Sequence, residues 1–364
     1  MEIIYNKFNR FSIREIFNIE KEKWNDFVRS NSTGHVFHLY DLSIMGIYQE
    51  CENISFAIYD NCNKEIVLLM PLYLKKEKIS EKHGYSLKLV SQRGLVIKDN
   101  LPPKVKNYLT NFFIDYFDEL FLRYRIENEF VIEMPALAKF NQIKGKQVIN
   151  PLVYLGFEPS IRYSWVINLK KPIKRIFEDC EATTRQALRK LLKSQDYYFC
   201  EPTDETKFKD CQDFIKLAKE TYARSLGEPK NSKYYEYLFN NIPSSLCRFY
   251  FLKDSKTKSI IASAIILIYE DTAFYFSNVS KTEKPVGINK FLVYRIMLEL
   301  KKMGITLFEV GGAYPYSRIG SKRKGISDFK KSFGAELHTI HKGMFVRNKF
   351  IYISKKTENT DYEK

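Results

Sequence analysis

Residues 291–312 read FLVYRIMLELKKMGITLFEVGG. The first part predicts a helix over about 289–303. Gly304 suits the position just past its end, because glycine tolerates a positive φ angle. The apolar run 305–310 that follows is typical of a buried strand. A helix that leads directly into a buried strand indicates an α/β unit.

The residues before this helix predict a hairpin, and the whole arrangement occurs twice. The second copy has strands over 248–252 and 260–268, then the helix and strand just described. The first copy has strands over 55–59 and 66–74, a helix over 105–122 and a strand over 130–134. The repeat predicts an α/β (α+β) fold of two tandem domains, with mixed sheets flanked by helices.

A polar stretch over 136–150 separates the two copies. We therefore expect an N-terminal domain over 1–150 and a C-terminal domain over 151–352. Residues 353–364 are polar and charged, which is typical of a frayed tail.

The composition is that of a globular protein. The 364 residues are 45% apolar and 28% charged, with a formal net charge of +16, which argues against disorder and favours an anionic partner or a lysine-rich surface. The longest apolar run, 260–269, is far shorter than the roughly 20 residues of a membrane helix. No signal peptide is evident, and the six scattered cysteines suit reduced thiols. We expect a cytoplasmic protein without a transmembrane segment.

A basic helix is predicted over 184–193. Arg185, Arg189 and Lys193 share one face, since they are spaced by four residues. Like charges at this spacing repel each other. The face is therefore either solvated or in contact with phosphate groups.

A glycine pair follows the last predicted core strand. Gly311 and Gly312 would let a ligand approach the backbone closely. The segment beyond them is expected to form a single loop with four cations, which are Arg318, Lys322, Arg323 and Lys324. This loop is either a flexible surface segment or a binding loop.

Several common catalytic motifs are absent from the sequence. It contains no GxGxxG, no P-loop, no HExxH and no GxSxG. His338 and His341 have no cysteine or carboxylate cluster at ligand spacing, so no metal is expected.

Residues 325–334, GISDFKKSFG, resemble the G-hydrophobic-x-x-F-K-x-x-F-G signature of the Fem-type aminoacyltransferases and related GNAT-like acyltransferases. Four further segments are similar to family elements and occur in the family's order. They are 35–40 (HVFHLY), 184–193 (TRQALRKLLK), 221–224 (TYAR) and 308–312 (FEVGG).

The resemblance implies two GNAT-like domains with a cleft between them. It implies transfer of an amino acid from aminoacyl-tRNA to an amine of a nucleotide- or lipid-linked muropeptide. Lys330, next to Phe329 in the motif, would lie near the reacting carbonyl, and Arg224 would contact an acceptor phosphate. The residues expected to contact substrates are Arg224, Tyr314, Gly311, Gly312, Arg185, Arg189 and Arg318.

The sequence departs from the family at Gly46, where members that bind a nucleotide-linked muropeptide carry lysine. Two alternatives therefore stay open. One is an N-acyltransferase of an amino sugar in surface polysaccharide synthesis that uses acyl-CoA, although residues 285–289 (PVGIN) offer only one glycine for its diphosphate. The other is a non-catalytic relative that binds a glycan or RNA.

If the protein is an enzyme, we expect no tightly bound cofactor, and we expect aminoacyl-tRNA or acyl-CoA as a co-substrate. The envelope precursor would allow a peripheral contact with the inner membrane face.

Overall fold

The computed structural model describes residues 10–46, 51–80, 84–91, 93–126, 129–142, 148–225 and 230–346. The chain divides into two compact units. The first comprises Met1–Arg162 with Ile340–Lys364, and the second comprises Tyr163–Thr339. The units thus part at residue 162, whereas the expected boundary was at residue 150. The chain returns to the first unit from Ile340 on. The tail expected over 353–364 lies outside the described residues.

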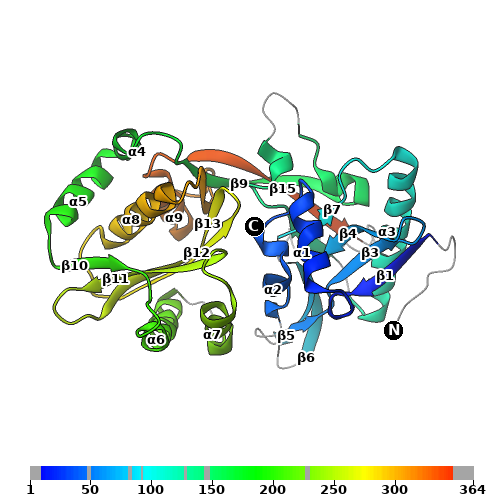
Figure 1. Cartoon of the computed structure of the whole chain (residues 1–364), viewed down its shortest axis with the longest axis horizontal. Helices are drawn as coiled ribbons and strands as arrows, with labels where there is room; N and C mark the ends of the chain where they lie inside the picture. Colours follow the sequence, from blue (N-terminus) through cyan, green and yellow to red (C-terminus); the bar gives the residue numbers. More distant parts are fainter. Residues whose placement is uncertain are drawn as a thin grey trace, which may run out of the picture. The chain divides into compact units, whose positions relative to one another are not determined.

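The first unit contains small antiparallel sheets, and helix α3 shares a hydrophobic core with their strands (Figure 1). Its sheets have the strand orders β1-β3-β4-β7 and β2-β5-β6. Its elements, in order, are β1 (Phe11–Glu15), η1 (Ile16–Asn18), α1 (Lys21–Ser30), η2 (Val36–His38), α2 (Tyr40–Ser43), β2 (Cys51–Asn53), β3 (Phe56–Asp60), β4 (Glu65–Met70), β5 (Leu72–Ser80), β6 (Gly84–Ser91), β7 (Val96–Ile97), α3 (Pro103–Arg123), β8 (Glu129–Glu133), η4 (Lys139–Gln142) and η5 (Pro151–Leu155).

Helix α3 confirms the helix expected over 105–122, and its aromatic face forms the centre of the first core. Phe117 is fully buried. Its ring lies 5.5 Å from Phe130, 6.2 Å from Phe157 and 5.4 Å from Phe345, measured between centroids. Phe345 belongs to the last strand, which pairs with β8. The C-terminal strand is therefore part of the first core.

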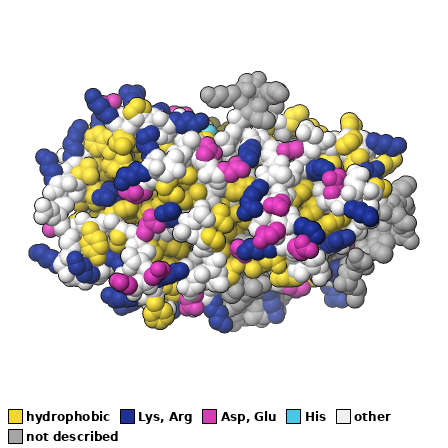
Figure 2. Space-filling model, viewed as in Figure 1, with side chains coloured by type: hydrophobic (Ala, Val, Ile, Leu, Met, Phe, Trp, Pro, Cys, Tyr) yellow, Lys and Arg dark blue, Asp and Glu magenta, His cyan; other side chains and the backbone are white. Residues whose placement is uncertain are grey.

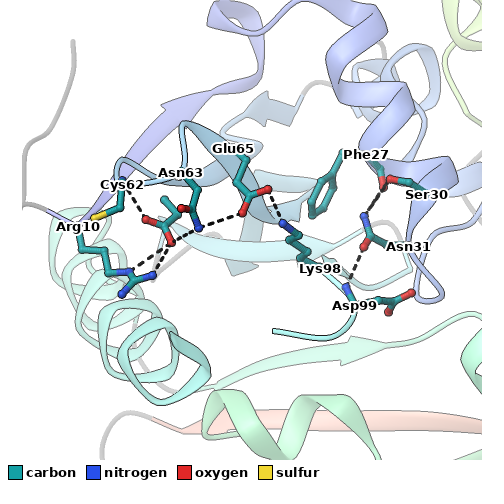
Figure 3. Close-up of polar contacts among 10 residues, drawn as sticks. Arg10, Phe27, Ser30, Asn31, Cys62, Asn63, Glu65, Lys98 and Asp99 are labelled. Carbon is teal, nitrogen blue, oxygen red and sulfur yellow. Dashed lines mark hydrogen bonds and ion pairs between the residues drawn. The ribbon is translucent and has the colours of Figure 1, made fainter. Parts of the chain in front are cut away.

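A polar network fixes the turn between β3 and β4 (Figure 3). The buried carboxylate of Asp60 accepts hydrogen bonds from Arg10 Nη2 at 2.7 Å and from the backbone N–H of Cys62 at 3.0 Å. Across the turn, Glu65 forms an ion pair with Lys98. Since these partners are all supplied within the unit, we assign the network a structural role.

The strands of the second unit belong to an eight-stranded mixed sheet with the order β10-β11-β12-β13-β14-β9-β15-β8 (Figure 1). Strands β9 and β15 each run from one unit into the other. The elements are β9 (Glu158–Asn168), α4 (Ile173–Asp179), α5 (Ala182–Lys193), β10 (Tyr197–Cys200), α6 (Lys207–Ser225), α7 (Ser232–Asn241), β11 (Cys247–Asp254), β12 (Ile260–Tyr269), β13 (Thr272–Ser280), α8 (Ile288–Lys302), β14 (Leu307–Ala313), α9 (Lys322–Lys331) and β15 (Glu336–Val346).

Helices cover both faces of this sheet. Tyr250 and Leu252 of β11 belong to the core cluster that includes side chains of α5 and α8. The alternate residue Phe249 stacks on Phe239 of α7 and meets Phe214 of α6 edge to face. Because successive strand residues point to opposite faces, both faces of β11 are buried, as a sheet between helix layers requires.

The α/β fold expected from the sequence is confirmed, with one correction near the glycine pair. Helix α8 and strand β14 follow the prediction, and Gly304 has φ +82°. The cations at 322–324, however, do not lie in a loop. They form the first turn of α9, which Ser321 begins by accepting a hydrogen bond from the backbone N–H of Lys324. An ion pair between Lys324 and Asp328 supports the same turn.

Candidate active site

The parallel strands β13 and β14 pair over only three residue pairs among the described residues, from Thr272–Leu307 to Phe274–Glu309. Directly after this point the pairing of β14 with β9 is shifted by a bulge between Glu309 and Gly311. Bulges bend a strand and redirect its side chains, and they are common next to active sites. The end of β14 is therefore the place in the second unit where backbone groups can face a ligand.

Gly311 allows a lysine to approach this strand end. Its φ angle is +90°, which L side chains rarely adopt, and a Cβ atom here would lie 3.1 Å from Lys330 Nζ. Lys330 is half-buried on α9, and its Nζ donates a hydrogen bond to Gly312 O at 3.4 Å. The structure thus brings together three of the residues expected at the site.

Ser327 fixes α9 against the sheet at the same place. Its buried Oγ accepts a hydrogen bond from Trp165 Nε1 at 2.9 Å and one from the backbone N–H of Tyr314 at 3.0 Å. The Tyr314 hydroxyl lies over Gly312, 3.2 Å from where a Cβ would stand. The ring of Phe329 packs edge to face on Phe333 at 5.3 Å, so its contact is one of packing. These contacts hold Lys330 on a rigid helix.

A buried carboxylate lies just before the bulge. Glu309 is 1% exposed, and its Oε1 accepts a hydrogen bond from Ser164 Oγ of the neighbouring strand at 2.7 Å. The sequence analysis missed Ser164 and Ser327. Ser327 lies inside the GISDFK segment, but at a variable position of the motif. Ser164 has no local signal, because only the pairing of β9 with β14 brings it to Glu309.

Arg224 lies in a second basic group, at the end of β13. Its Nη1 donates to Thr282 Oγ1 at 2.6 Å, and its Nη2 donates to Ser280 O. Partial burial lowers the pKa of Lys284, and the positive charge of Arg224 lowers it further. Lys284 Nζ in turn donates to the carbonyl of Lys281 at 2.7 Å. An anion bound here would relieve the repulsion between these cations.

The two arginines predicted to contact phosphate on α5 have partners in α4. Arg185 Nη1 donates to Glu178 O at 3.0 Å and also to Cys180 O, so it satisfies carbonyls at the end of that helix. Arg189 lies over the ring of Phe177, with Cζ 5.5 Å from the centroid. The hydrogen bonds favour a structural role for Arg185, whereas the side chain of Arg189 is exposed and meets α4 through the ring of Phe177.

Other basic side chains on the same helices point to solvent. Lys190 and Lys193 are exposed on α5. Figure 2 shows Lys and Arg side chains at the left of the view, where Figure 1 places α4 and α5. Arg318 is likewise exposed, in the turn before α9.

The part of the chain that the structure describes holds neither a metal-ligand cluster nor a membrane-spanning helix. No three His, Cys, Asp or Glu side chains are grouped as metal ligands among these residues. No helix in the described ranges is both long enough and apolar enough to cross a bilayer.

Comparison with known proteins places this site within a known fold. Residues 179–331 match the acetyltransferase (GNAT) domain family, and this match includes Arg224, Gly311 and Lys330. No curated protein matches the sequence. The crystal structure of FemX is similar over 92% of this chain and 98% of its own, with 15% identity and a TM-score of 0.65.

Two other solved structures have the same fold. One is described as the C-terminal domain of a putative lysylphosphatidylglycerol synthetase from Agrobacterium fabrum. Its identity to this chain is 16% and the TM-score is 0.56, and the match covers 93% of this chain and 95% of that structure's chain. The other is a tandem GNAT protein from the clavulanic acid biosynthesis pathway, solved without acetyl-CoA; it has 9% identity and a TM-score of 0.52 and covers 93% of this chain and 98% of its own. Residues 179–331 thus match a GNAT-type acetyltransferase domain, and the chain as a whole has the fold seen in FemX.

Proposed function

We propose that this protein forms an amide by moving an aminoacyl group from aminoacyl-tRNA to an amine of a cell-envelope precursor. The observation that carries the proposal is the Lys330 ammonium at the glycine strand end, 3.4 Å from Gly312 O. The likeness to FemX and to a lysylphosphatidylglycerol synthetase domain supports aminoacyl transfer. We place the reaction in the cytoplasm, where charged tRNA is available.

The chemistry needs little from the protein beyond position and charge. The neutral acceptor amine attacks the ester carbonyl carbon, and the carbonyl oxygen becomes an oxyanion. The Lys330 ammonium stabilises this oxyanion. When the intermediate collapses, the C–O bond to the ribose breaks, the amide remains, and the amine proton leaves with the ribose hydroxyl or to water. Because the ester is already activated, positioning supplies much of the remaining rate.

The turn before α8 supports tRNA over acyl-CoA as the donor. The N-terminus of a helix can bind a diphosphate through its free N–H groups. Here a Cβ on Gly287 would lie 2.8 Å from the Cβ of Ala187, so helix α5 packs directly on this turn. The backbone N–H of Ile288 is also engaged, by Pro285 O at 3.2 Å.

In the first unit, the position where the resemblance implies an acceptor-binding lysine is Gly46, and its surroundings bear on the choice of acceptor. A Cβ on Gly46 would lie 2.0 Å from the ring of the buried Tyr73, so a lysine side chain does not fit at this position. Recognition of an acceptor phosphate is therefore assigned to Arg224 and its basic neighbours in the second unit.

A second candidate function is N-acylation of an amino sugar with acyl-CoA as the donor. The observation in its favour is the group of Arg224, Lys281 and Lys284 at the end of β13, which suits the diphosphate of CoA as well as that of an acceptor.

The deciding experiment measures binding of the purified chain to charged tRNA, uncharged tRNA and acetyl-CoA at two salt concentrations. We expect salt-sensitive binding to charged tRNA and transfer of its amino acid to an added amine acceptor. Binding and turnover with acetyl-CoA alone would establish the second candidate. Binding of RNA without any transfer would instead identify a non-catalytic relative.

A further inference from the structure

The segment between β14 and α9 presents two apolar side chains to solvent. It consists of two consecutive turns, closed by hydrogen bonds from Ser317 N to Tyr314 O at 3.3 Å and from Ser321 N to Arg318 O at 3.1 Å. Tyr316 lies within the first turn and is 91% exposed, and Ile319 lies within the second and is 90% exposed. Both side chains therefore project from the corners of an ordered backbone.

Basic side chains surround this apolar pair. Residues 314–324 contain four cations and no carboxylate. Arg318, Lys322 and Arg323 are exposed, and the guanidinium of Arg323 lies 5.9 Å from the ring of Tyr314. Ile326, in the next turn of α9, adds a third partly exposed apolar side chain at 41%.

We propose that the tip formed by residues 314–324 docks on an anionic lipid bilayer. Tyrosine prefers the boundary between headgroups and acyl chains, and isoleucine gains free energy from burial in the acyl region. Each cation near the surface adds electrostatic attraction to anionic headgroups. An RNA partner would account for the cations, but it offers no apolar environment to a fully exposed isoleucine, so the bilayer explains more of what the tip presents.

The position of the tip links it to the site in the same unit. Its first residue, Tyr314, has its hydroxyl over Gly312, and its last residues begin the helix that carries Lys330. The inference rests on the proposed function only for its purpose, because docking would bring a membrane-anchored acceptor to this site. Docking itself can be measured without any substrate.

The test is co-sedimentation of the full chain with vesicles in the absence of donor and acceptor. The vesicles are pure phosphatidylcholine or phosphatidylcholine with about one third phosphatidylglycerol. We expect binding to the anionic vesicles alone. Ile319→Asp and Tyr316→Asp should each weaken it at least about tenfold, since each removes an apolar side chain that docking would bury in the bilayer and adds a charge that anionic headgroups repel.

The matched control is Phe17→Asp, which places the same charge at another exposed aromatic, 57% exposed, in the first unit. It should bind vesicles as the unaltered chain does. Failure of the unaltered chain to bind anionic vesicles, or equal binding by Ile319→Asp, would overturn the proposal. Loss of tRNA binding in Ile319→Asp without loss of vesicle binding would reassign the tip to RNA. None of these outcomes depends on amide formation, so the proposed function stands or fails separately.

Discussion

The two copies of the strand–helix–strand plan end in opposite ways. In the second unit, β14 runs into Gly311 and Gly312, where Lys330 reaches the backbone. In the first unit, β8 runs into Met134, which is fully buried and whose Sδ would lie 2.8 Å from a Cβ on Gly94. The backbone N–H of Met134 also donates to His341 O at 2.8 Å. Both strand ends keep a strand partner, since Gly311 and Gly312 pair with β9. The difference is that glycines leave room over one strand end, whereas a buried methionine side chain fills the space at the other.

The repeated fold supplies two equivalent strand ends, and the side chains there decide which one carries chemistry. A fold does not by itself specify a function. If the comparison holds, changes at the end of β14 should act on turnover, and changes to buried groups in the first unit should act on stability.

Lys330→Ala should have the largest effect. Loss of a charge that stabilises the oxyanion typically lowers kcat by about 10²- to 10³-fold. We expect that loss in a transfer assay, with acceptor affinity retained. Lys331→Ala, which removes the exposed neighbouring ammonium on the same helix, is the matched control and should keep full activity. Unchanged turnover in Lys330→Ala would remove the role assigned to this residue.

The buried histidines of the first unit predict a loss of stability in acid. Burial lowers the pKa of His38 from 6.5 to about 4, and burial lowers that of His35 well below its usual value. The unfolded chain therefore binds more protons than the folded one between these pKa values. The contribution of these histidines to the free energy of unfolding is greatest above pH 6.5 and decreases as the pH drops. For His38 alone, the decrease from neutral pH to pH 5 is about 2 kcal/mol.

Denaturant unfolding of the chain at pH 7.5 and pH 5 measures this effect. His38→Leu cannot make the hydrogen bond that the ring Nε2 donates to Arg93 O, so it should be less stable at pH 7.5. It should also depend less on pH. An equal pH dependence in the variant and the unaltered chain would mean that other groups cause it.

Gly311→Ala should have an intermediate effect on both properties. The positive φ costs an alanine about 1 kcal/mol of stability. Its Cβ would also stand 3.1 Å from Lys330 Nζ and displace the ammonium, so we expect turnover to fall about tenfold. Gly304→Ala is the matched control, because Gly304 has φ +82° but no atom within 4 Å of the added Cβ. It should lose similar stability and keep its activity. Equal activity in the two variants would contradict the close approach of Lys330.

The sequence predicted the elements whose side chains repeat regularly and missed those that depend on tertiary pairing. Helix α8 and strand β12 were predicted because each buries a long apolar series. Strand β13 was missed, since the register of its pairing with β12 shifts between Ile265 and Ile266 and this shift breaks a simple alternation. The first turn of helix α9, with the cations at 322–324, was expected to lie in a loop. Its N-cap and its ion pair depend on single contacts that a pattern does not display.

The candidate site was predicted to a similar extent. The structure places Gly311, Gly312 and Lys330 close together, and their roles at a substrate stay a prediction. The spacing of Arg185 and Arg189 indicated a shared face but could not reveal that this face contacts α4. Which neighbour a helix face meets is decided by packing across the fold, and a local pattern does not record it.

The smallest expected effect is on the salt dependence of tRNA binding, and it distinguishes the two lysines of α5 from its two arginines. If tRNA contacts this helix, the exposed Lys190 and Lys193 carry the contact, since Arg185 and Arg189 are engaged by α4. Lys190→Gln combined with Lys193→Gln should reduce the slope of log affinity against log salt by about 0.7 to 0.9 per cation, because each lost phosphate contact releases one counterion fewer.

The matched control for this slope is Lys75→Gln combined with Lys104→Gln, two exposed cations of the first unit, and its slope should not change. A double substitution of Arg185 and Arg189 to Gln should leave the slope in place and lower stability instead, because it removes the hydrogen bonds to the end of α4. If that variant flattens the slope and the lysine variant does not, the arginines leave α4 to bind RNA, and the phosphate contact predicted from their spacing is correct. If the first-unit control reduces the slope equally, cations of both units contact tRNA. The difference between the two units would then not include binding of the donor.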